Sequence, residues 1–434
     1  MNGISDGRTR AVPRSVASAA LERAARRLVL GHLRHLQGGR LTLTDAISTS
    51  EVGSGGGLSA RVRVHGADFY RRLLVGGGLG AAESFMDGGW SSHDLTATLR
   101  LFARNMALSD AMDGGWAALR TLFERILHRL RANTRRGSAR NIRVHYDLGN
   151  EFFELFLDPT LTYSAGIFEH PGATMEAAST AKMERICRKL RLTASDHLLE
   201  IGSGWGALAI HAAREHGCRV TTTTISPEQH RLARRRIREA GLERRVTVLL
   251  KDYRDLEGRY DKLVSVEMVE AVGHAYLGDY FGRCAGLLKP DGLMLLQAIV
   301  TPEYRYESSR RSIDLIRRYI FPGSCLTSVG RISEALARST DFSTLHLEDI
   351  GPHYAETLRR WRRRFRRNLG RVRALGYDER FIRLWDYYLC YCEAGFEEGI
   401  VGDIQLLLGR PKQRHPALLG KLHAAAGIAG PGAE

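Results

Sequence analysis

From Ser195 onward, short apolar strands alternate with helical segments, and this alternation constrains the fold more than any other feature of the chain. The strand-like stretches are HLLEIG, CRVTTTTI, RVTVLL, YDKLVSVE and GLMLLQAIV, and helical sequence begins between them near Trp205, Pro227 and Ala275. Such alternation predicts an α/β fold with a mainly parallel sheet that carries helices on both faces. A ligand is then expected at the carboxyl ends of the strands, near the first turn from strand to helix.

The chain has 434 residues, which leaves room for a second domain. We expect disordered residues at 1–15, a small α+β domain over 16–130, a polar linker RANTRRGSARN at 131–141, a main domain over 142–412 and a frayed tail at 413–434. In the small domain a helix is expected over 16–36, followed by strand-like pieces LTLTDA and ARVRVHGADFYRRLLVGG. After Val300 the main domain is interrupted by a helical insertion around SSRRSIDLIRRYIFPG. It then continues with a strand STLHLEDI, two helices and a last strand DIQLLLGR.

The first turn of the main domain, LLEIGSGWGA at 198–207, combines Glu200 with Gly202, Gly204 and Gly206. Glycines allow a sharp turn from strand into helix and let a ligand lie against the backbone. The same letters fit the dinucleotide fingerprint G-x-G-x-x-A, but the second strand ends in three Thr instead of the acid that would bind a ribose. The missing acid argues against a nicotinamide or flavin cofactor, which is kept as an alternative together with a purely structural turn. The acid inside the motif resembles that of class I S-adenosylmethionine (SAM) methyltransferases.

Six motifs follow one another from His145 onward: HYDLGNEFFELFLDPTLTYSAGIF, LLEIGSGWG, TISPEQ, KDYRDL, VEMVEAVG and RYIFPG. In this order they resemble the cyclopropane-fatty-acyl-phospholipid synthase family over about 145–410. GLGAAESFMDGGW resembles the small lipid-facing N-terminal domain of that family. The resemblance implies a Rossmann-like class I SAM-methyltransferase domain with a mainly parallel seven-stranded sheet and a helical insertion. It also implies SAM as cofactor and the addition of a methylene unit to a cis double bond of an unsaturated phospholipid acyl chain.

The resemblance assigns the cofactor to positions in four motifs. The TYS segment contacts SAM, the glycine turn lies beneath its methionine part, TISPEQ reaches the ribose region and KDYRDL lies by the adenine. The residues carried over in this way are Tyr163, Ser164, Glu200, Gly202, Gly204, Trp205, Gly206, Thr224, Ser226, Gln229 and Tyr253.

The resemblance further implies a base that removes a proton from the new methyl group, namely a bicarbonate ion held by a Cys, a Glu, a His and a Tyr. Glu270 and Tyr319 match two of these positions, whereas Ala165 stands in place of the Cys and Gln297 in place of the His. Gln can still donate to an anion, but with the Cys missing the binding of bicarbonate is doubtful. Loss of the proton elsewhere would give a methyl-branched, methylene or methylated-alkene chain, so we expect lipid C-methylation ahead of ring closure.

Each catalytic candidate also has a structural interpretation. Glu270 fits an acid at a helix N-terminus, and Tyr319 fits core packing. Cys392 occupies the position of a Cys considered as a nucleophile in the family, but direct attack on SAM needs no covalent enzyme intermediate, so a structural role is favoured. Cys390 and Cys392 lie about 200° apart on a helix, and the His residues show no ligand spacing, so no metal site is expected.

The charge of the chain bears on its partners. Lys and Arg number 64 against 48 Asp and Glu, giving a net charge of +16, which suits nucleic acid, an anionic membrane or an acidic substrate. The basic stretch at 358–373 carries an apolar stripe of Leu358, Trp361, Phe365, Leu369 and Val372. It predicts either a solvated helix against the core or a helix that docks on anionic lipid headgroups.

Two further function classes compete with lipid methylation. A nucleic-acid methyltransferase acting on base amino groups would normally show an N/D/S-P-P-Y/F loop after the fourth strand, and VEMVEAVG stands there instead, so no nucleic-acid partner is expected. The third alternative is a basic peripheral membrane protein that has lost catalytic activity. In that interpretation, Ala165 and Gln297 replace catalytic residues that are no longer needed.

The start of the chain, MNGISDGRTRAVPRS, lacks an apolar signal core, and charges interrupt every apolar run. We therefore expect a cytoplasmic protein that is peripheral on the inner face of the membrane and acts on phospholipid there. The sequence leaves open whether it forms a homodimer.

Overall fold

A computed structural model describes residues 16–106 and 148–414. The segments expected at 1–15 and 131–141, and residues 415–434 of the expected tail, lie outside the described residues. Contacts divide the chain into two compact units. The first unit comprises Met1–Leu130, Ser312–Ile320 and Phe365–Glu398, and the second comprises Arg131–Arg311, Phe321–Arg364 and Gly399–Glu434.

The second unit is built on a seven-stranded sheet in the order β10-β11-β9-β8-β5-β6-β7. Strands β9, β8, β5, β6 and β7 pair in parallel, and β11 runs antiparallel to both β9 and β10. The expectation of a mainly parallel sheet of the class I methyltransferase type is confirmed. The strands are β5 His197–Ile201, β6 Arg219–Thr224, β7 Val246–Leu250, β8 Tyr260–Val266, β9 Leu288–Val300, β10 Ser343–Asp349 and β11 Gly402–Gly409.

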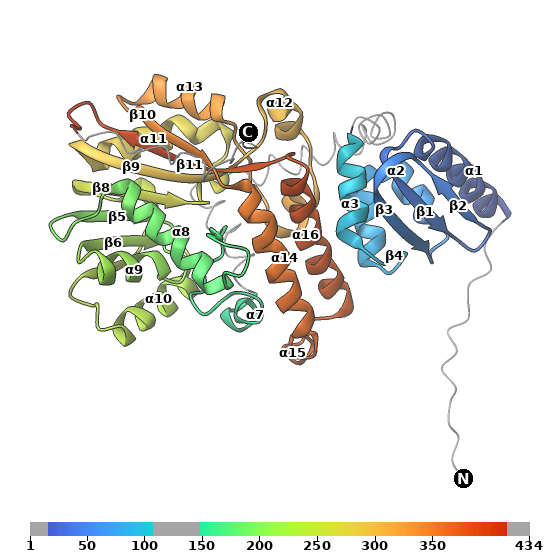
Figure 1. Ribbon diagram of the computed structural model, residues 1–434, viewed down its shortest axis with the longest axis horizontal. Helices are drawn as coiled ribbons and strands as arrows, with labels where there is room; N and C mark the ends of the chain where they lie inside the picture. Colours follow the sequence, from blue (N-terminus) through green and yellow to red (C-terminus); the bar gives the residue numbers. More distant parts are fainter. Residues whose placement is uncertain (1–15, 107–147, 415–434) are drawn as a thin grey trace, which may run out of the picture. The chain divides into compact units, whose positions relative to one another are not determined.

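Alternating side chains of the central strands enter two separate cores, as the period of two of a strand requires. Leu199, Met294 and Leu296 pack in one core with α11 and α13. Leu198, Leu293 and Leu295 pack in the other with α8, α9 and α10. Helices therefore cover both faces of the sheet (Figure 1).

The helices of the second unit begin at residues suited to capping. Thr174, Ser226 and Ser328 each accept a hydrogen bond from the backbone N–H three residues on, which satisfies a donor that the first helical turn leaves free. These helices are α7 Asn150–Glu154, α8 Met175–Leu190, α9 Ala207–Glu215, α10 Pro227–Glu239, α11 Leu277–Leu287, α12 Glu303–Arg311, α13 Val329–Ser339 and α14 Gly351–Arg367.

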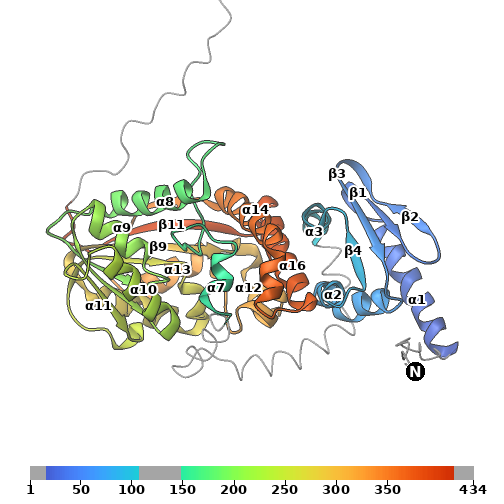
Figure 2. The same cartoon turned by 90° about the horizontal axis from the view of Figure 1, so that it is seen from below.

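The first unit has a four-stranded sheet in the order β2-β1-β3-β4, in which β1 and β3 are parallel. Figure 2 shows α1, α2 and α3 gathered around this sheet. Its elements are α1 Val16–Leu33, β1 Gln37–Thr44, β2 Thr49–Val52, β3 Ser54–Val64, α2 Phe69–Met86, β4 Trp90–Ser92, α3 Leu95–Arg104, α15 Leu369–Ala374 and α16 Glu379–Glu397. The part of the chain that the structure describes contains no helix long and apolar enough to cross a bilayer.

The prediction of a strand for one segment of the small domain is wrong in its second half. ARVRVHGADFYRRLLVGG ends as a strand at Val64, and its second half begins α2 at Phe69. Phe69 and Tyr70 are buried by packing of the helix, not by pairing in the sheet. Residues 312–320 and 365–398, which the expected sequence boundaries assign to the main domain, make their contacts in the first unit.

Candidate active site

The glycine turn follows β5 and leaves an open backbone surface. Gly202, Gly204 and Gly206 have φ angles of 101°, 48° and 87°, which glycine adopts without strain. The backbone N–H groups of Gly202 and Ser203 donate to the Thr223 carbonyl at 3.0 and 2.9 Å, which ties the turn to β6. A Cβ atom added at Gly202 would lie 3.4 Å from the Met268 side chain. A Cβ atom added at Gly204 would have no other atom within 4 Å. The space above the turn is therefore free for a ligand.

Glu200 is the last acid before this turn and is buried. Its Oε2 atom has no hydrogen-bond partner among the described residues. Burial raises the pKa of Glu200 to about 8, against the opposing influence of the Lys182 charge. A buried acceptor without a partner is costly, so Glu200 suits a ligand that brings hydrogen-bond donors, as SAM does.

The loop after β6 is organised by side chains that cap α10. The Thr224 hydroxyl donates to Gln229 Oε1 at 2.8 Å and accepts from the Ser226 backbone N–H at 3.1 Å. The Gln229 backbone N–H donates to the Ser226 hydroxyl at 3.3 Å. All three predicted residues thus form one polar cluster at the carboxyl end of β6.

Aromatic side chains pack around Tyr163 of the TYS segment. The Tyr163 ring lies 5.3 Å from Phe153 and 5.3 Å from Trp361, measured between ring centroids. Trp205 packs on Phe153 at 5.0 Å, and its indole N–H donates to Asn150 Oδ1 at 2.7 Å. This packing holds α7 against the glycine turn, and the Tyr163 ring packs on the same helix at Phe153.

Tyr253 lies in a 3-10 turn, Tyr253–Asp255, after β7. Its ring packs against Tyr280 at 5.3 Å, and the Arg254 guanidinium lies 5.5 Å from the ring centroid. Burial raises the pKa of Tyr253 to about 12, so its hydroxyl stays neutral. All the residues that the resemblance assigns to the cofactor lie in the second unit, and the open turn, the unpartnered Glu200 oxygen and this ring fit SAM.

Glu270 occupies a 3-10 turn, Val269–Ala271, after β8. Its Oε1 accepts the Ile299 backbone N–H at 2.6 Å, and its Oε2 is buried without a partner among the described residues. Burial, and then the negative charge of Glu267, raise the pKa of Glu270 to about 8. A carboxyl group with this pKa and a free oxygen is suited to proton transfer near neutral pH.

Gln297 lies on β9 and joins two carboxyl groups that sequence reasoning did not single out as site residues. Its side-chain amide donates to Glu267 Oε1 at 2.8 Å and to Asp403 Oδ2 at 2.9 Å. Its carbonyl oxygen accepts from Gln405 Nε2 at 3.1 Å. The one signal in the sequence is an Asp beside a strongly apolar run, DIQLLLG, since charged residues in a central strand are rare without a partner.

Lys182 of α8 is a second residue that the sequence did not single out. It is buried, and its ammonium group donates to the Ser164 hydroxyl at 2.8 Å. Burial lowers the pKa of Lys182, and the charges of Glu267, Asp403 and Glu200 oppose that change. The Lys182 amino group thus lies between Ser164 of the predicted cofactor segment and the acids whose charges act on it.

Tyr319 and Cys392 belong to the first unit. The Tyr319 hydroxyl donates to Glu83 Oε1 at 2.9 Å, and the Arg380 guanidinium lies 5.9 Å from its ring centroid. Burial and the charge of Asp314 raise the pKa of the Cys392 thiol. A neutral thiol is a weak nucleophile, which agrees with the structural role favoured for Cys392.

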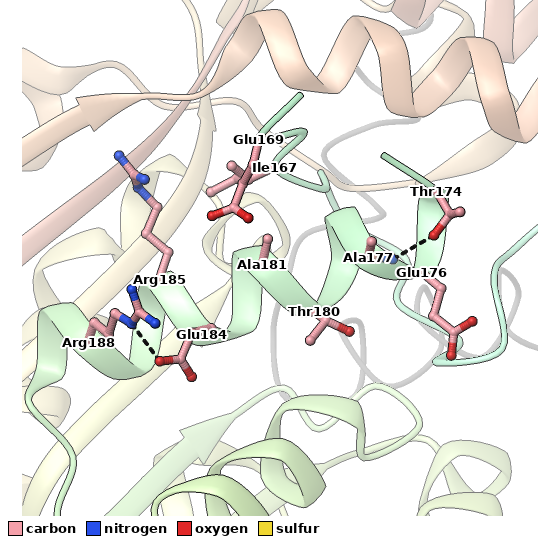
Figure 3. Close-up of a pocket in the computed structure, with 10 residues that line it drawn as sticks. All are labelled: Ile167, Glu169, Thr174, Glu176, Ala177, Thr180, Ala181, Glu184, Arg185 and Arg188. Carbon is pink, nitrogen blue, oxygen red and sulfur yellow. Dashed lines mark hydrogen bonds and ion pairs between the residues drawn. The ribbon is translucent and has the colours of Figure 1, made fainter. Parts of the chain in front are cut away.

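A hollow of about 560 Å³ lies on the outer side of α8 and does not include the predicted cofactor residues (Figure 3). Its charged lining residues are Glu169, Glu176, Glu184, Arg185 and Arg188, and the others are Ile167, Thr174, Ala177, Thr180 and Ala181. Glu184 Oε2 is also hydrogen bonded to His211 and His216, at 3.2 and 3.0 Å. These imidazoles, whose ligand atoms lie within 4.8 Å of each other and of the Cys187 thiol, already have a carboxylate partner.

Comparison with known proteins decides the family. The family model described as mycolic acid cyclopropane synthetase matches residues 133–406. The chain belongs to this family. The suspected kinship with cyclopropane-fatty-acyl-phospholipid synthases is thereby confirmed.

Several relatives of this mycolic acid cyclopropane synthetase family member cover most of its length. It is 38% identical over 418 residues to the tuberculostearic acid methyltransferase of Mycobacterium tuberculosis, covering 92% of this chain and 94% of the relative. It is 34% identical over 375 residues to the cyclopropane-fatty-acyl-phospholipid synthase of Escherichia coli K12, covering 83% and 90%. A crystal structure of a mycolic acid cyclopropane synthase complexed with SAH and CTAB matches 62% of this chain and 98% of that chain, with 30% identity and a TM-score of 0.59.

Membership in the mycolic acid cyclopropane synthetase family makes the chain a SAM-dependent lipid methyltransferase. SAM is its cofactor, in agreement with the open glycine turn and the unpartnered Glu200 oxygen. The nicotinamide and flavin alternatives are thereby set aside.

Proposed function

We propose that this methyltransferase adds a one-carbon unit to the cis double bond of unsaturated acyl chains in membrane phospholipids. Support comes from Glu270, a buried carboxyl group with an unpartnered oxygen and a pKa near 8, in the same compact unit as the cofactor residues. The relatives named for fatty-acyl-phospholipid and tuberculostearic acid chemistry support the same class of acceptor.

When bound, the cofactor supplies an electrophilic methyl group on a sulfonium. In the proposed reaction the π electrons of the alkene form the new C–C bond, and a cation is left on the acyl chain. Aromatic faces such as that of Tyr163 stabilise a cation without reacting with it. Glu270 then accepts a proton on its free Oε2 atom, and the electron pair of the broken C–H bond completes the product.

The site of proton loss decides the product. Removal from the new methyl group closes a cyclopropane ring, or gives an exocyclic methylene when a hydride has first shifted from the methylated carbon to the cation. Removal from a chain carbon gives a methylated alkene. The 38% identity to a tuberculostearic acid methyltransferase favours a product without a ring, and the 34% identity to a cyclopropane synthase favours ring closure. Both outcomes share the same methyl transfer and the same base.

The test is mass spectrometry of lipids from cells that express the chain with labelled methionine and oleate. We expect a labelled gain of one CH2 on monounsaturated chains. A product that resists mild hydrogenation is a cyclopropane, and one that takes up two hydrogens is an alkene. Bound SAM without labelled lipid would contradict the proposal and point to another acceptor, including RNA.

Glu270→Gln separates the base from cofactor binding. We expect it to lower turnover by at least 100-fold, in the range of general-base catalysis, while the affinity for SAH stays within about twofold of wild type. The matched control is Glu239→Gln on the exposed end of α10, which is expected to change neither quantity. Unchanged turnover in Glu270→Gln would remove Glu270 from the reaction.

We further propose that the chain works at the inner, anionic face of the cytoplasmic membrane. On α14 the apolar stripe residues Leu358, Trp361 and Phe365 are buried. Arg363, Arg366 and Arg367 of the same helix are exposed. Guanidinium groups on such a face attract anionic headgroups by about 1 kcal/mol each.

A further inference from the structure

Glu267 connects the two positions at which this chain departs from the expected bicarbonate site. The backbone N–H of Ala165 donates to Glu267 Oε1 at 3.0 Å, and the Gln297 amide donates to the same oxygen at 2.8 Å. The Tyr354 hydroxyl donates to the other oxygen, Oε2, at 2.6 Å. Three segments of the chain thus direct hydrogen-bond donors at the half-buried carboxyl group of Glu267.

The backbone of Glu267 is held in an uncommon conformation. Its φ angle is 48°, in the left-handed region that non-glycine residues seldom adopt. Its N–H donates to the Gln297 carbonyl at 2.8 Å, directly after β8. Such a conformation costs free energy and is typical of functional sites, so the turn is built to direct this side chain.

The donors at the Ala165, Gln297 and Ile299 positions are already used by the protein. The Ala165 N–H and one N–H of the Gln297 amide donate to Glu267, and the other amide N–H donates to Asp403. The Ile299 N–H donates to Glu270. Next to these donors, Oε2 of Glu270 and Oδ1 of Asp403 have no partner among the described residues. At these positions a bicarbonate ion would meet carboxyl oxygens instead of free donors, so the residues that stand there do not fit it.

We propose that Glu267, positioned by Gln297 and Asp403, supplies the negative charge that a bound bicarbonate would otherwise bring, and that Glu270 acts as the base without bicarbonate. This inference rests on the proposed function, because it concerns the base of that reaction. Glu270 is the catalytic residue, and Glu267 and Asp403 are positioning residues that act through it.

The proton balance needs no further reactant. Glu270 Oε2 gains the proton that the alkylated chain loses, and the C–H electron pair stays in the product as a ring or double bond. The groups facing Glu270 are Glu267 at the end of β8 and Asp403 on β11, with Lys182 of α8 and Tyr354 of α14 bonded or coupled to those acids. The Glu267 charge disfavours the ionised form of Glu270, so it makes Glu270 a stronger base.

The first experiment measures bicarbonate directly. Isothermal titration of bicarbonate into the protein with SAH bound is expected to show no saturable binding up to 50-fold the protein concentration. Methyl transfer from labelled SAM to phospholipid vesicles is expected to be the same in CO2-free buffer and in added bicarbonate. Saturable binding, or activity that falls on depletion and returns with bicarbonate, would overturn the inference.

The second experiment tests Glu267 through a pH profile. In wild type, turnover is expected to rise with pH through about 8 as Glu270 ionises. In Glu267→Gln, which keeps an oxygen for the Ala165 and Gln297 donors, that rise is expected to move to lower pH and the plateau rate to fall at least tenfold. Asp403→Asn is expected to shift the profile in the same direction, and Glu239→Gln is expected to leave it in place.

The outcomes separate the two proposals. A wild-type pH profile in Glu267→Gln, with labelled lipid still formed, would overturn this inference alone. Absence of labelled lipid from wild type itself would overturn the proposed function and this inference with it.

Discussion

At the scale of single residues, the second unit keeps unusually many acids out of water. Glu200, Glu270 and Asp403 are buried and Glu267 is half-buried, and all four interact with one another or with the buried Lys182 side chain. Burial disfavours the charged form of a carboxyl group, so Glu200 and Glu270 retain protons at higher pH than exposed acids do. At Glu267 the hydrogen bonds from Tyr354, Ala165 and Gln297 oppose the effect of burial and favour the ionised form. Such groups weaken the fold and are kept where chemistry needs them.

Glu200 predicts a particular dependence of stability on pH. Its pKa is raised by burial from 4.5 to about 8, so its stabilising contribution is complete below about pH 4.5 and is lost as the pH rises through 8. Glu200→Gln has no proton to lose. Without cofactor, the free energy of unfolding of wild type is therefore expected to fall relative to the variant by up to about 1.4 kcal/mol per pH unit in this range.

Urea unfolding at pH 5, 6.5 and 8 measures this difference. Glu239→Gln, on an exposed stretch of α10, is expected to show a constant offset from wild type. A constant offset for Glu200→Gln as well would contradict the raised pKa.

At the scale of elements, the junction from β5 to α9 was predictable because its glycines have a local conformational reason. The three glycines of the turn have φ angles of 101°, 48° and 87°. The motif E-x-G-x-G-x-G places a glycine at each of these positions and therefore predicts the turn. The second half of ARVRVHGADFYRRLLVGG was not predictable, because its apolar residues fit a strand or a helix equally well. Packing of Phe69 and Phe85 near Trp90 decides for the helix.

Alanine substitutions at two glycines with positive φ angles distinguish the effect of backbone strain from a direct effect on cofactor binding. Gly202→Ala brings a Cβ to 3.4 Å from Met268 at a φ of 101°, and we expect SAH affinity to fall at least tenfold. Gly241→Ala, at a φ of 68° with no atom within 4 Å, is expected to cost about 1 kcal/mol of stability and leave SAH affinity unchanged. Titration calorimetry and thermal unfolding measure both quantities, and equal loss of affinity in the two variants would show that strain alone is responsible.

At the scale of the whole molecule, some of the basic side chains form ion pairs with acids, and others are exposed to solvent. Arg185 and Lys189 bind Glu348 within the second unit, and Arg100 and Arg104 bind Glu398 within the first, so these cations are used in ion pairs inside each unit. The exposed Arg363, Arg366 and Arg367 of α14 instead face solvent. Surface attraction without an anchor is reversible and sensitive to salt.

The combined substitution Arg363→Gln, Arg366→Gln and Arg367→Gln tests the membrane face. Binding to vesicles with 30% anionic lipid is expected to fall about 100-fold, because three residues at about 1 kcal/mol each contribute about 3 kcal/mol. The control removes the same charge from Arg231, Arg235 and Arg238 of α10, which lie beside carboxylates, and is expected to change binding about twofold or less. Co-sedimentation measures both, and equal loss in the two would assign the effect to net charge alone.

The sequence by itself determined the order of strands and helices, the glycine turn and the family, because these depend on local periodicity and on the spacing of residues within short motifs. It also placed Glu270 just after the fourth strand and Gln297 in the fifth, and the structure has Glu270 in the turn after β8 and Gln297 on β9. Only the tertiary structure decided that Glu267, Asp403 and Lys182 join them, because β8, β11 and α8 are distant in the chain and no local pattern records their contact. Burial is likewise a property of the folded molecule, and it is burial that changes these acids from ordinary carboxylates into groups that hold protons near neutral pH.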